Sequence, residues 1–197
     1  MRNERTIIAG FGGQGIMTMG QLLAQAGLDE GRNVSWLPSY GPEMRGGTAN
    51  CDVIVDDDEI ASPVVHGDAT SVVIMNLPSM KFVDDLVSGG VALVNSSLVD
   101  AVVARGDVMA VYVPANELAA GLGNLVTTNL VMLGAYTELT ECVAAASVLQ
   151  ALEKKLGGRK AHLMEVNRQA FSAGAVSVRE QLGVARNGKP VFSTTEK

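Results

Sequence analysis

Two glycine-rich segments contain the residues of this chain that are best suited to binding a ligand. Residues 7–15 read Ile-Ile-Ala-Gly-Phe-Gly-Gly-Gln-Gly, an apolar run that leads into four glycines within six positions. Glycine lets backbone N–H groups approach a ligand where a Cβ atom would collide, and a helix that follows directs its positive end at the same point. The pattern predicts a strand, a phosphate-binding turn and then a helix.

The second segment, residues 39–47, reads Ser-Tyr-Gly-Pro-Glu-Met-Arg-Gly-Gly and predicts an exposed loop with one carboxylate and one cation. Arg45 can form paired hydrogen bonds with a carboxylate or a phosphate. A structural alternative exists for each segment, because the first glycines can simply shape a tight turn and the second loop can be solvated surface. The candidate ligand-binding residues are Gly12, Gly13, Gln14, Gly15, Ser39, Tyr40, Gly41, Glu43, Arg45, Gly46 and Gly47.

The first segment also fits the G-x-G-x-x-G pattern of dinucleotide-binding folds. That fold places an acid about 20 residues further on, at the end of the second strand, where it binds a ribose hydroxyl. Here residues 35–38 read Ser-Trp-Leu-Pro, whereas Asp29 and Glu30 come too early, at the end of the predicted helix. A nicotinamide-dependent dehydrogenase is therefore disfavoured.

The remaining polar residues offer no catalytic set and no metal site. His66 and His162 are the only histidines and are isolated from each other in sequence. Cys51 and Cys142 are far apart, whereas an iron–sulfur cluster needs about four thiolates. Asn129 lies in an apolar helical segment and needs a hydrogen-bond partner, for which the backbone is favoured over a ligand.

Composition and charge limit the class of protein. The chain has 197 residues, of which 47% are hydrophobic and only 4% aromatic, and its net charge is −6. This acidic balance argues against nucleic acid as a partner. We expect a soluble, cytoplasmic protein with reduced thiols, because residues 1–5 do not resemble a signal peptide and no apolar run reaches the roughly 18 residues of a membrane span.

Periodicity predicts an α/β fold with one three-layer α/β/α domain over residues 1–182, a mainly parallel sheet and a C-terminal tail over 183–197. The strand at 48–56 follows a loop without a helix and is expected to pair antiparallel. A turn is expected at Gly89-Gly90, and Ser147 is a predicted N-cap. The predicted strands are 6–10, 33–38, 48–56, 71–75, 91–95 and 108–113, and the predicted helices are 16–31, 78–87, 114–120, 124–139, 147–156 and 160–182.

Four segments together resemble the gamma subunit of 2-oxoacid:ferredoxin oxidoreductases. They are residues 10–16, 39–47, Asn129-Leu-Val-Met-Leu-Gly134 and Asn167-Arg-Gln-Ala-Phe171, which occur in the order of that family. The resemblance extends over roughly residues 5 to 180, and the second segment is its most specific part. The form of that segment is more similar to the 2-oxoglutarate and branched-chain 2-oxoacid members than to the pyruvate members.

The resemblance implies a subunit that is not catalytic by itself. In such complexes, partner subunits hold thiamine diphosphate, magnesium and iron–sulfur clusters, and coenzyme A is a substrate. The implied partners are alpha, beta and delta subunits, the last of them ferredoxin-like, with ferredoxin as electron acceptor. The two glycine-rich loops become candidates for binding the phosphates of coenzyme A or for docking the catalytic subunits.

Two other classes of protein remain open at this stage. The chain could be a self-sufficient nucleotide-binding oxidoreductase, or a structural assembly protein whose glycines only shape turns. The apolar segment 124–139 is expected to be buried against the rest of the domain or against a partner. From this segment we also expect the isolated chain to form a homodimer.

Overall fold

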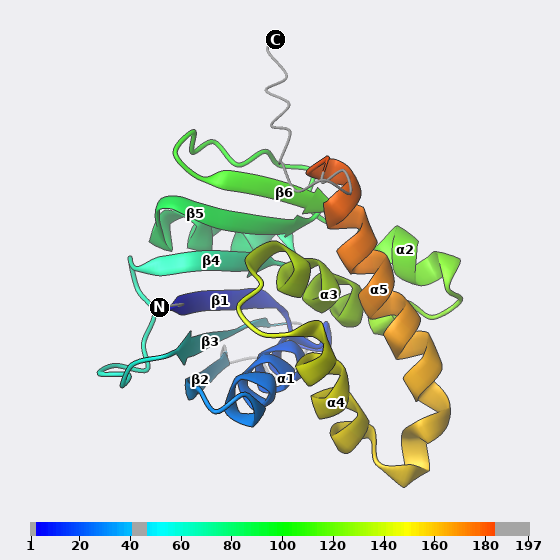
Figure 1. Ribbon diagram of the computed structural model, residues 1–197. Coiled ribbons are helices and arrows are strands. Elements are labelled where there is room, and N and C mark those ends of the chain that lie inside the picture. The colour runs from blue at the N-terminus through cyan, green and yellow to red at the C-terminus, as the bar shows by residue number, and fades with distance from the viewer. Residues whose placement is uncertain (1–2, 41–46, 184–197) are drawn as a thin grey trace.

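The computed structural model describes residues 3–40 and 47–183, and six strands form one sheet in the order β2-β3-β1-β4-β5-β6. Figure 1 shows β1 near the middle of this sheet, with helices in front of it. The strands are β1 (Glu4–Phe11), β2 (Asn33–Tyr40), β3 (Thr48–Asp56), β4 (Ala69–Ile74), β5 (Leu86–Asn95) and β6 (Met109–Val113).

The direction of the strands agrees with the predicted mainly parallel sheet. β4 pairs parallel with β1 and with β5, and β5 pairs parallel with β6. In contrast, β3 pairs antiparallel with both β1 and β2. The antiparallel placement of residues 48–56 is therefore confirmed. Because β3 reverses direction between them, β2 and β1 point the same way, and the carboxyl ends of five strands lie at one edge of the sheet.

Side chains from successive positions of the central strands enter two separate hydrophobic clusters, one on each face of the sheet. Ile8 and Val73 face the helices α1 (Ile16–Asp29) and α3 (Thr128–Thr140), whereas Ile7 and Val72 face the opposite side. Burial on both faces explains why the strands read as continuous apolar runs. The opposite face is covered by the 3-10 helix η1 (Leu77–Asp85) and by irregular segments.

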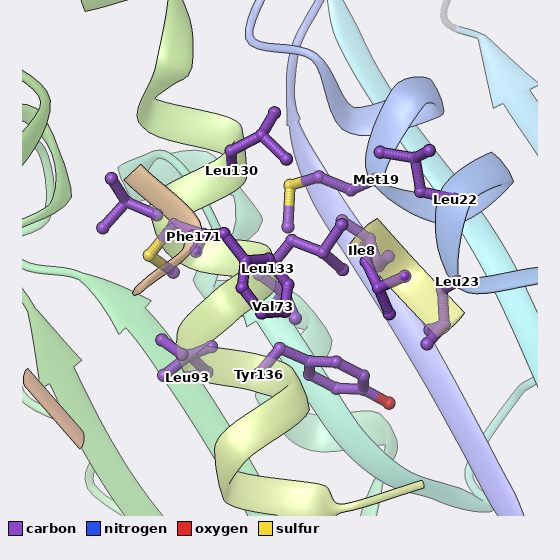
Figure 2. Packing of buried hydrophobic residues seen from close by; sticks show 14 of the residues in the cluster. Ile8, Met19, Leu22, Leu23, Val73, Leu93, Leu130, Leu133, Tyr136 and Phe171 are labelled. Carbon is purple, nitrogen blue, oxygen red and sulfur yellow. The ribbon is translucent and has the colours of Figure 1, made fainter. Parts of the chain in front are cut away.

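The helix α3 lies in the middle of the helical layer and is buried on all sides. It contacts α1, α2 (Ala115–Gly121), α4 (Ala145–Leu156) and α5 (Met164–Gln181), and also β5. In Figure 2, Leu133 and Tyr136 of this helix point at side chains of the sheet, of α1 and of α5. The prediction that this segment is buried against the rest of the domain is confirmed.

Glycines allow α3 and α5 to cross at very short distance. A Cβ atom on Gly134 would lie 1.9 Å from the carbonyl oxygen of Phe171, and one on Gly174 would lie 1.8 Å from that of Val131. The two backbones therefore touch, and α5 closes the outer side of α3 (Figure 1).

Several predicted boundaries and caps were wrong. Residues 78–87 form the 3-10 helix η1 and the start of β5 rather than one α-helix, and Gly89-Gly90 lies inside β5 at a register shift instead of in a turn. The segments 124–139 and 160–182 each begin with a 3-10 turn, namely η2 (Leu125–Thr127) and η3 (Gly158–Leu163).

The N-cap of α4 is Ala144 rather than Ser147. Its backbone N–H donates to Oε1 of Glu30, at 2.7 Å, so a carboxylate from the end of α1 satisfies this helix end. Most of the predicted tail lies outside the described residues. Within the described residues, no helix has the length and apolar character needed to cross a membrane.

Candidate functional site

The first glycine-rich segment forms the connection from β1 to α1 at the carboxyl edge of the sheet. Gly13 and Gly15 have φ angles of +100° and +78°, in the left-handed region that favours glycine. Gly15 is the N-cap of α1, and no side chain caps this helix. The first turn also contains no acidic residue, so the helix itself supplies no negative charge to compensate the positive end of its dipole.

The side chain of Gln14 fixes the shape of this turn instead of extending into solvent. Its Oε1 accepts a hydrogen bond from the backbone N–H of Phe11 at 2.6 Å, and its Nε2 donates to the carbonyl oxygen of Met75 at 3.2 Å. A Cβ atom on Gly10 would lie 2.6 Å from the same Oε1. Gln14 thus fastens the turn to the end of β4, and Gly10 leaves room for it.

The described ends of the second glycine-rich segment, Tyr40 and Gly47, lie beside the first segment. Phe11 pairs with Thr48 in the antiparallel register, and the N–H of Gly12 donates to the carbonyl oxygen of Gly47 at 3.0 Å. The two segments enclose a cavity of about 280 Å³, to which Tyr40 also contributes. The described parts of the two segments therefore lie side by side.

The predicted site residues differ in how the structure places them. Gly12, Gly13, Gly15, Tyr40 and Gly47 line the small cavity. Ser39 lies in β2 and is exposed, and it lines none of the described cavities. The other four predicted residues, Gly41, Glu43, Arg45 and Gly46, lie outside the described residues.

A larger cleft of about 600 Å³ opens on the other side of the same turn. Gly13, Gly15 and Thr18 line both cavities, so the start of α1 separates them. The opposite wall of the cleft is built by η2 and the start of α3, together with residues of α4 and α5. Lys155 is the one charged residue that lines the cleft within the described part of the chain.

Asn129, at the start of α3, faces this cleft and was not predicted as a ligand-binding residue. The expectation that the backbone pairs with its side chain was wrong for Oδ1, which is buried and has no hydrogen-bond partner among the described residues. The signals in the sequence were a single asparagine in an apolar helix and its place at the start of a segment that resembles the family. The sequence alone did not show that this asparagine lies against the glycine turn.

The acids near the end of α1 are engaged away from the turn. Asp29 accepts from Nζ of Lys154 at 2.9 Å, and its pKa is lowered mainly by this hydrogen bond. Residues 35–38 lie in β2, so no acid occupies the end of the second strand. Among residues 3–40 and 47–183, no carboxylate is therefore placed to bind a ribose as in a dinucleotide site.

The two cysteines are buried and not bonded to each other. Burial raises the pKa of the Cys51 thiol to about 12 and that of the Cys142 thiol to about 11. Both thiols are therefore protonated at neutral pH and are poor nucleophiles. In residues 3–40 and 47–183 there is no group of three His, Cys, Asp or Glu side chains that could hold a metal ion.

Comparison with known protein families gives a match over most of the chain. Residues 5–177 match the family described as Pyruvate ferredoxin/flavodoxin oxidoreductase. Among curated relatives, the ketoisovalerate oxidoreductase subunit VorA of Methanothermobacter thermautotrophicus is 40% identical over 90% of this chain. The chain spans only 37% of the length of that relative.

Other relatives are similar to this chain over nearly their whole length. The 2-oxoglutarate synthase subunit KorC of Methanocaldococcus jannaschii is 35% identical, over 88% of this chain and 92% of the relative. Among solved structures, the gamma subunit of a keto/oxoacid ferredoxin oxidoreductase from Geobacter sulfurreducens is similar, with a TM-score of 0.76 and 28% identity over 90% of this chain and 99% of that one.

Proposed function

Because the chain belongs to the pyruvate ferredoxin/flavodoxin oxidoreductase family, we propose that it is the gamma subunit of a multi-subunit 2-oxoacid:ferredoxin oxidoreductase. The observation that carries this proposal is the similarity to the KorC subunit over 92% of its length, since it compares this chain with a whole subunit. The complex converts a 2-oxoacid and coenzyme A to an acyl-CoA and CO2, and ferredoxin receives the electrons.

Under this proposal the chain contributes no redox group of its own. Alpha, beta and delta subunits supply the thiamine diphosphate with its magnesium and the iron–sulfur clusters. The two thiols with raised pKa support this division, because thiolates are the form that ligates a cluster. The choice between 2-oxoglutarate, a branched-chain 2-oxoacid and pyruvate belongs to the subunits that hold thiamine diphosphate.

The chain's own contribution is a binding site for coenzyme A at the glycine turn. The uncapped start of α1 supplies backbone N–H donors and a partial positive charge, which suit a phosphate group. Gly13 and Gly15 add no side chain of their own at this helix end, and the adjoining cleft of about 600 Å³ is within the size range of cofactor sites. Arg45 belongs to the segment beside the turn and is proposed as a further phosphate ligand.

The same edge of the sheet offers a surface for docking the catalytic subunits. Phe11 and Tyr40 end β1 and β2, and Leu77 follows β4, so these exposed apolar side chains come from strand ends that share one edge. Leu125 and Val126, at the rim of the cleft, are 60% and 85% exposed. A partner that covers these side chains would also enclose a ligand at the glycine turn.

Purification of the tagged full-length chain from its native host tests the proposal. We expect co-purifying subunits, thiamine diphosphate, and the visible absorbance of iron–sulfur clusters, together with coenzyme A-dependent oxidation of a 2-oxoacid. The chain produced alone should be colourless and inactive with coenzyme A, a 2-oxoacid and an acceptor dye. Turnover by the chain alone, or purification from the host without any partner, would contradict the proposal.

A further inference from the structure

The buried amide of Asn129 has an unused hydrogen-bond acceptor. Asn129 is the second residue of α3 and is only 6% exposed, and its Oδ1 has no partner among the described residues. Buried polar atoms in folded proteins nearly always have a partner, so an exception needs a specific explanation. Of the buried side-chain atoms without a partner in the described part of the chain, this is the one whose residue lines the cleft at the glycine turn.

Other asparagines that line the cleft are paired within the protein. Oδ1 of Asn124 accepts from the N–H of Val126 at 3.1 Å, and Nδ2 of Asn167 donates to the carbonyl oxygen of Leu163 at 2.7 Å. These two side chains stabilise the starts of η2 and α5. Asn129 differs from them because its acceptor has no partner among the described residues.

The position of Asn129 relative to the glycine turn indicates what that group is. A Cβ atom on Gly15 would lie 2.5 Å from Nδ2 and 2.7 Å from Cγ of Asn129, so the amide lies directly against the N-cap of α1. The start of α1 offers N–H donors, and the buried Oδ1 acceptor belongs to a residue that lines the same cleft. A ligand that satisfies both has an anionic group next to a neutral N–H or O–H donor.

We propose that Asn129 is a binding residue for coenzyme A, whose Oδ1 accepts a hydrogen bond from a donor adjacent to a phosphate while that phosphate lies at the start of α1. This inference rests on the proposed function and adds a specific contact to it. Coenzyme A has such donors on both sides of its diphosphate: the hydroxyl and first amide of the pantetheine arm on one side, and the ribose hydroxyl on the other. An inorganic anion lacks both.

The test compares variants of α3 in the assembled complex. Asn129→Leu has a similar shape and no acceptor, and we expect the KM for coenzyme A to rise roughly tenfold with little change in kcat, as for one lost hydrogen bond to a ligand. The melting temperature should not fall, because the variant removes a buried acceptor that has no partner in the chain. Asn129→Asp keeps the shape and the acceptor but places a charge near the phosphate, so the KM should rise further.

Thr137→Val is the matched control on the same helix. Thr137 is also buried, but its Oγ1 donates to the carbonyl oxygen of Leu133 at 2.8 Å. Loss of this polar group should leave the KM for coenzyme A unchanged and should not raise the melting temperature. If Asn129 has a merely structural role, its variants will behave like this control or lose stability.

Direct binding of fragments to the same complexes identifies the donor. A loss of affinity of Asn129→Leu for 4′-phosphopantetheine, with unchanged affinity for 3′,5′-ADP, assigns the pantetheine arm, and the reverse assigns the ribose. Either result supports the inference. Unchanged affinity for coenzyme A and both fragments, in a complex that assembles and turns over, overturns the inference alone, whereas a wild-type complex that does not use coenzyme A overturns the proposed function.

Discussion

The crossing of α3 and α5 gives a sharp prediction for Gly134→Ala. The new Cβ atom would lie 1.9 Å from the carbonyl oxygen of Phe171, while real Cβ contacts are essentially never under 3.0 Å. The helices must therefore separate by roughly 1 Å, and overpacking of a core typically costs about 1–3 kcal/mol. We expect the upper end of that range, because the obstacle is backbone and not the end of a flexible side chain.

The better helix propensity of alanine offsets up to about 1 kcal/mol of this cost. The net loss in free energy of unfolding is then about 2 kcal/mol, which corresponds to a decrease in melting temperature of roughly 4–8 °C for a chain of this size. Urea unfolding and calorimetry of the isolated chain measure both quantities. Gly121→Ala is the control, because Gly121 lies in α2 and a Cβ atom there meets nothing within 4 Å, so the same substitution should be neutral or stabilising.

Gly174→Ala tests whether close contact of the helices is the cause. Its Cβ atom would lie 1.8 Å from the carbonyl oxygen of Val131 on the facing helix, so it should destabilise the fold like Gly134→Ala. Because both changes are relieved by the same separation, the double variant should lose clearly less stability than the two single losses combined. Unfolding of Gly134→Ala at the same urea concentration as the wild type would refute this account of the packing.

Three further predictions concern groups elsewhere in the chain. Cys51 and Cys142 should not react with a thiol reagent at pH 8 until the chain unfolds, because burial raises the pKa of these thiols to about 12 and 11; fast labelling of the native chain would contradict this. Burial also raises the pKa of Asp52, so its carboxyl group binds a proton more tightly in the native state than in the unfolded chain. The stability of the fold therefore falls as the pH rises from the pKa of Asp52 in the unfolded chain through its pKa in the native state. Asp52→Asn should therefore stabilise the fold at pH 7, with the gain disappearing below about pH 4. Urea unfolding at both pH values measures this gain, and a loss of stability at pH 7 would contradict the prediction. Arg45→Ala should raise the KM for coenzyme A or weaken assembly by about 1.5–3 kcal/mol, and Arg45→Lys should restore only part of the loss. Steady-state kinetics and the yield of complex measure both effects. Wild-type values for both variants would show that residues 39–47 form a solvated loop without a role in binding.

The glycine turn and the sheet could be predicted because their signals are local. An apolar run, glycines at fixed positions and a helical stripe define β1, the turn and α1 within one continuous stretch, Glu4 to Asp29, and the absence of a helix before β3 predicted its direction. Local signals gave wrong predictions where a residue distant in sequence determines the local structure. The start of α4 is stabilised by Glu30 at the end of α1, which is distant in sequence, so the nearby residues predicted Ser147 instead of Ala144 as the N-cap.

The candidate site was only partly predictable for the same reason. The wall of the cleft formed by α3 is more than 100 residues away in sequence from the glycine turn, and an asparagine in an apolar helix does not reveal what it faces. Gln14 is the opposite case. Its position within the turn suggested a ligand contact, but its amide is engaged by the backbone of Phe11 and Met75, and its proposed contribution is to hold the turn in shape.

The burial of α3 also changes where a partner is expected to bind. The apolar sequence of this helix was the reason to predict a homodimer, but α5 covers it by the close approach at Gly134 and Gly174. Within the segment 124–139, the exposed large apolar side chains are instead Leu125 and Val126, immediately before α3, at the rim of the cleft. If the isolated chain self-associates through this rim, a partner subunit and a second copy compete for the same surface. Self-association should then disappear in the complex, and Val126→Lys should weaken both forms of assembly without lowering the stability of the fold.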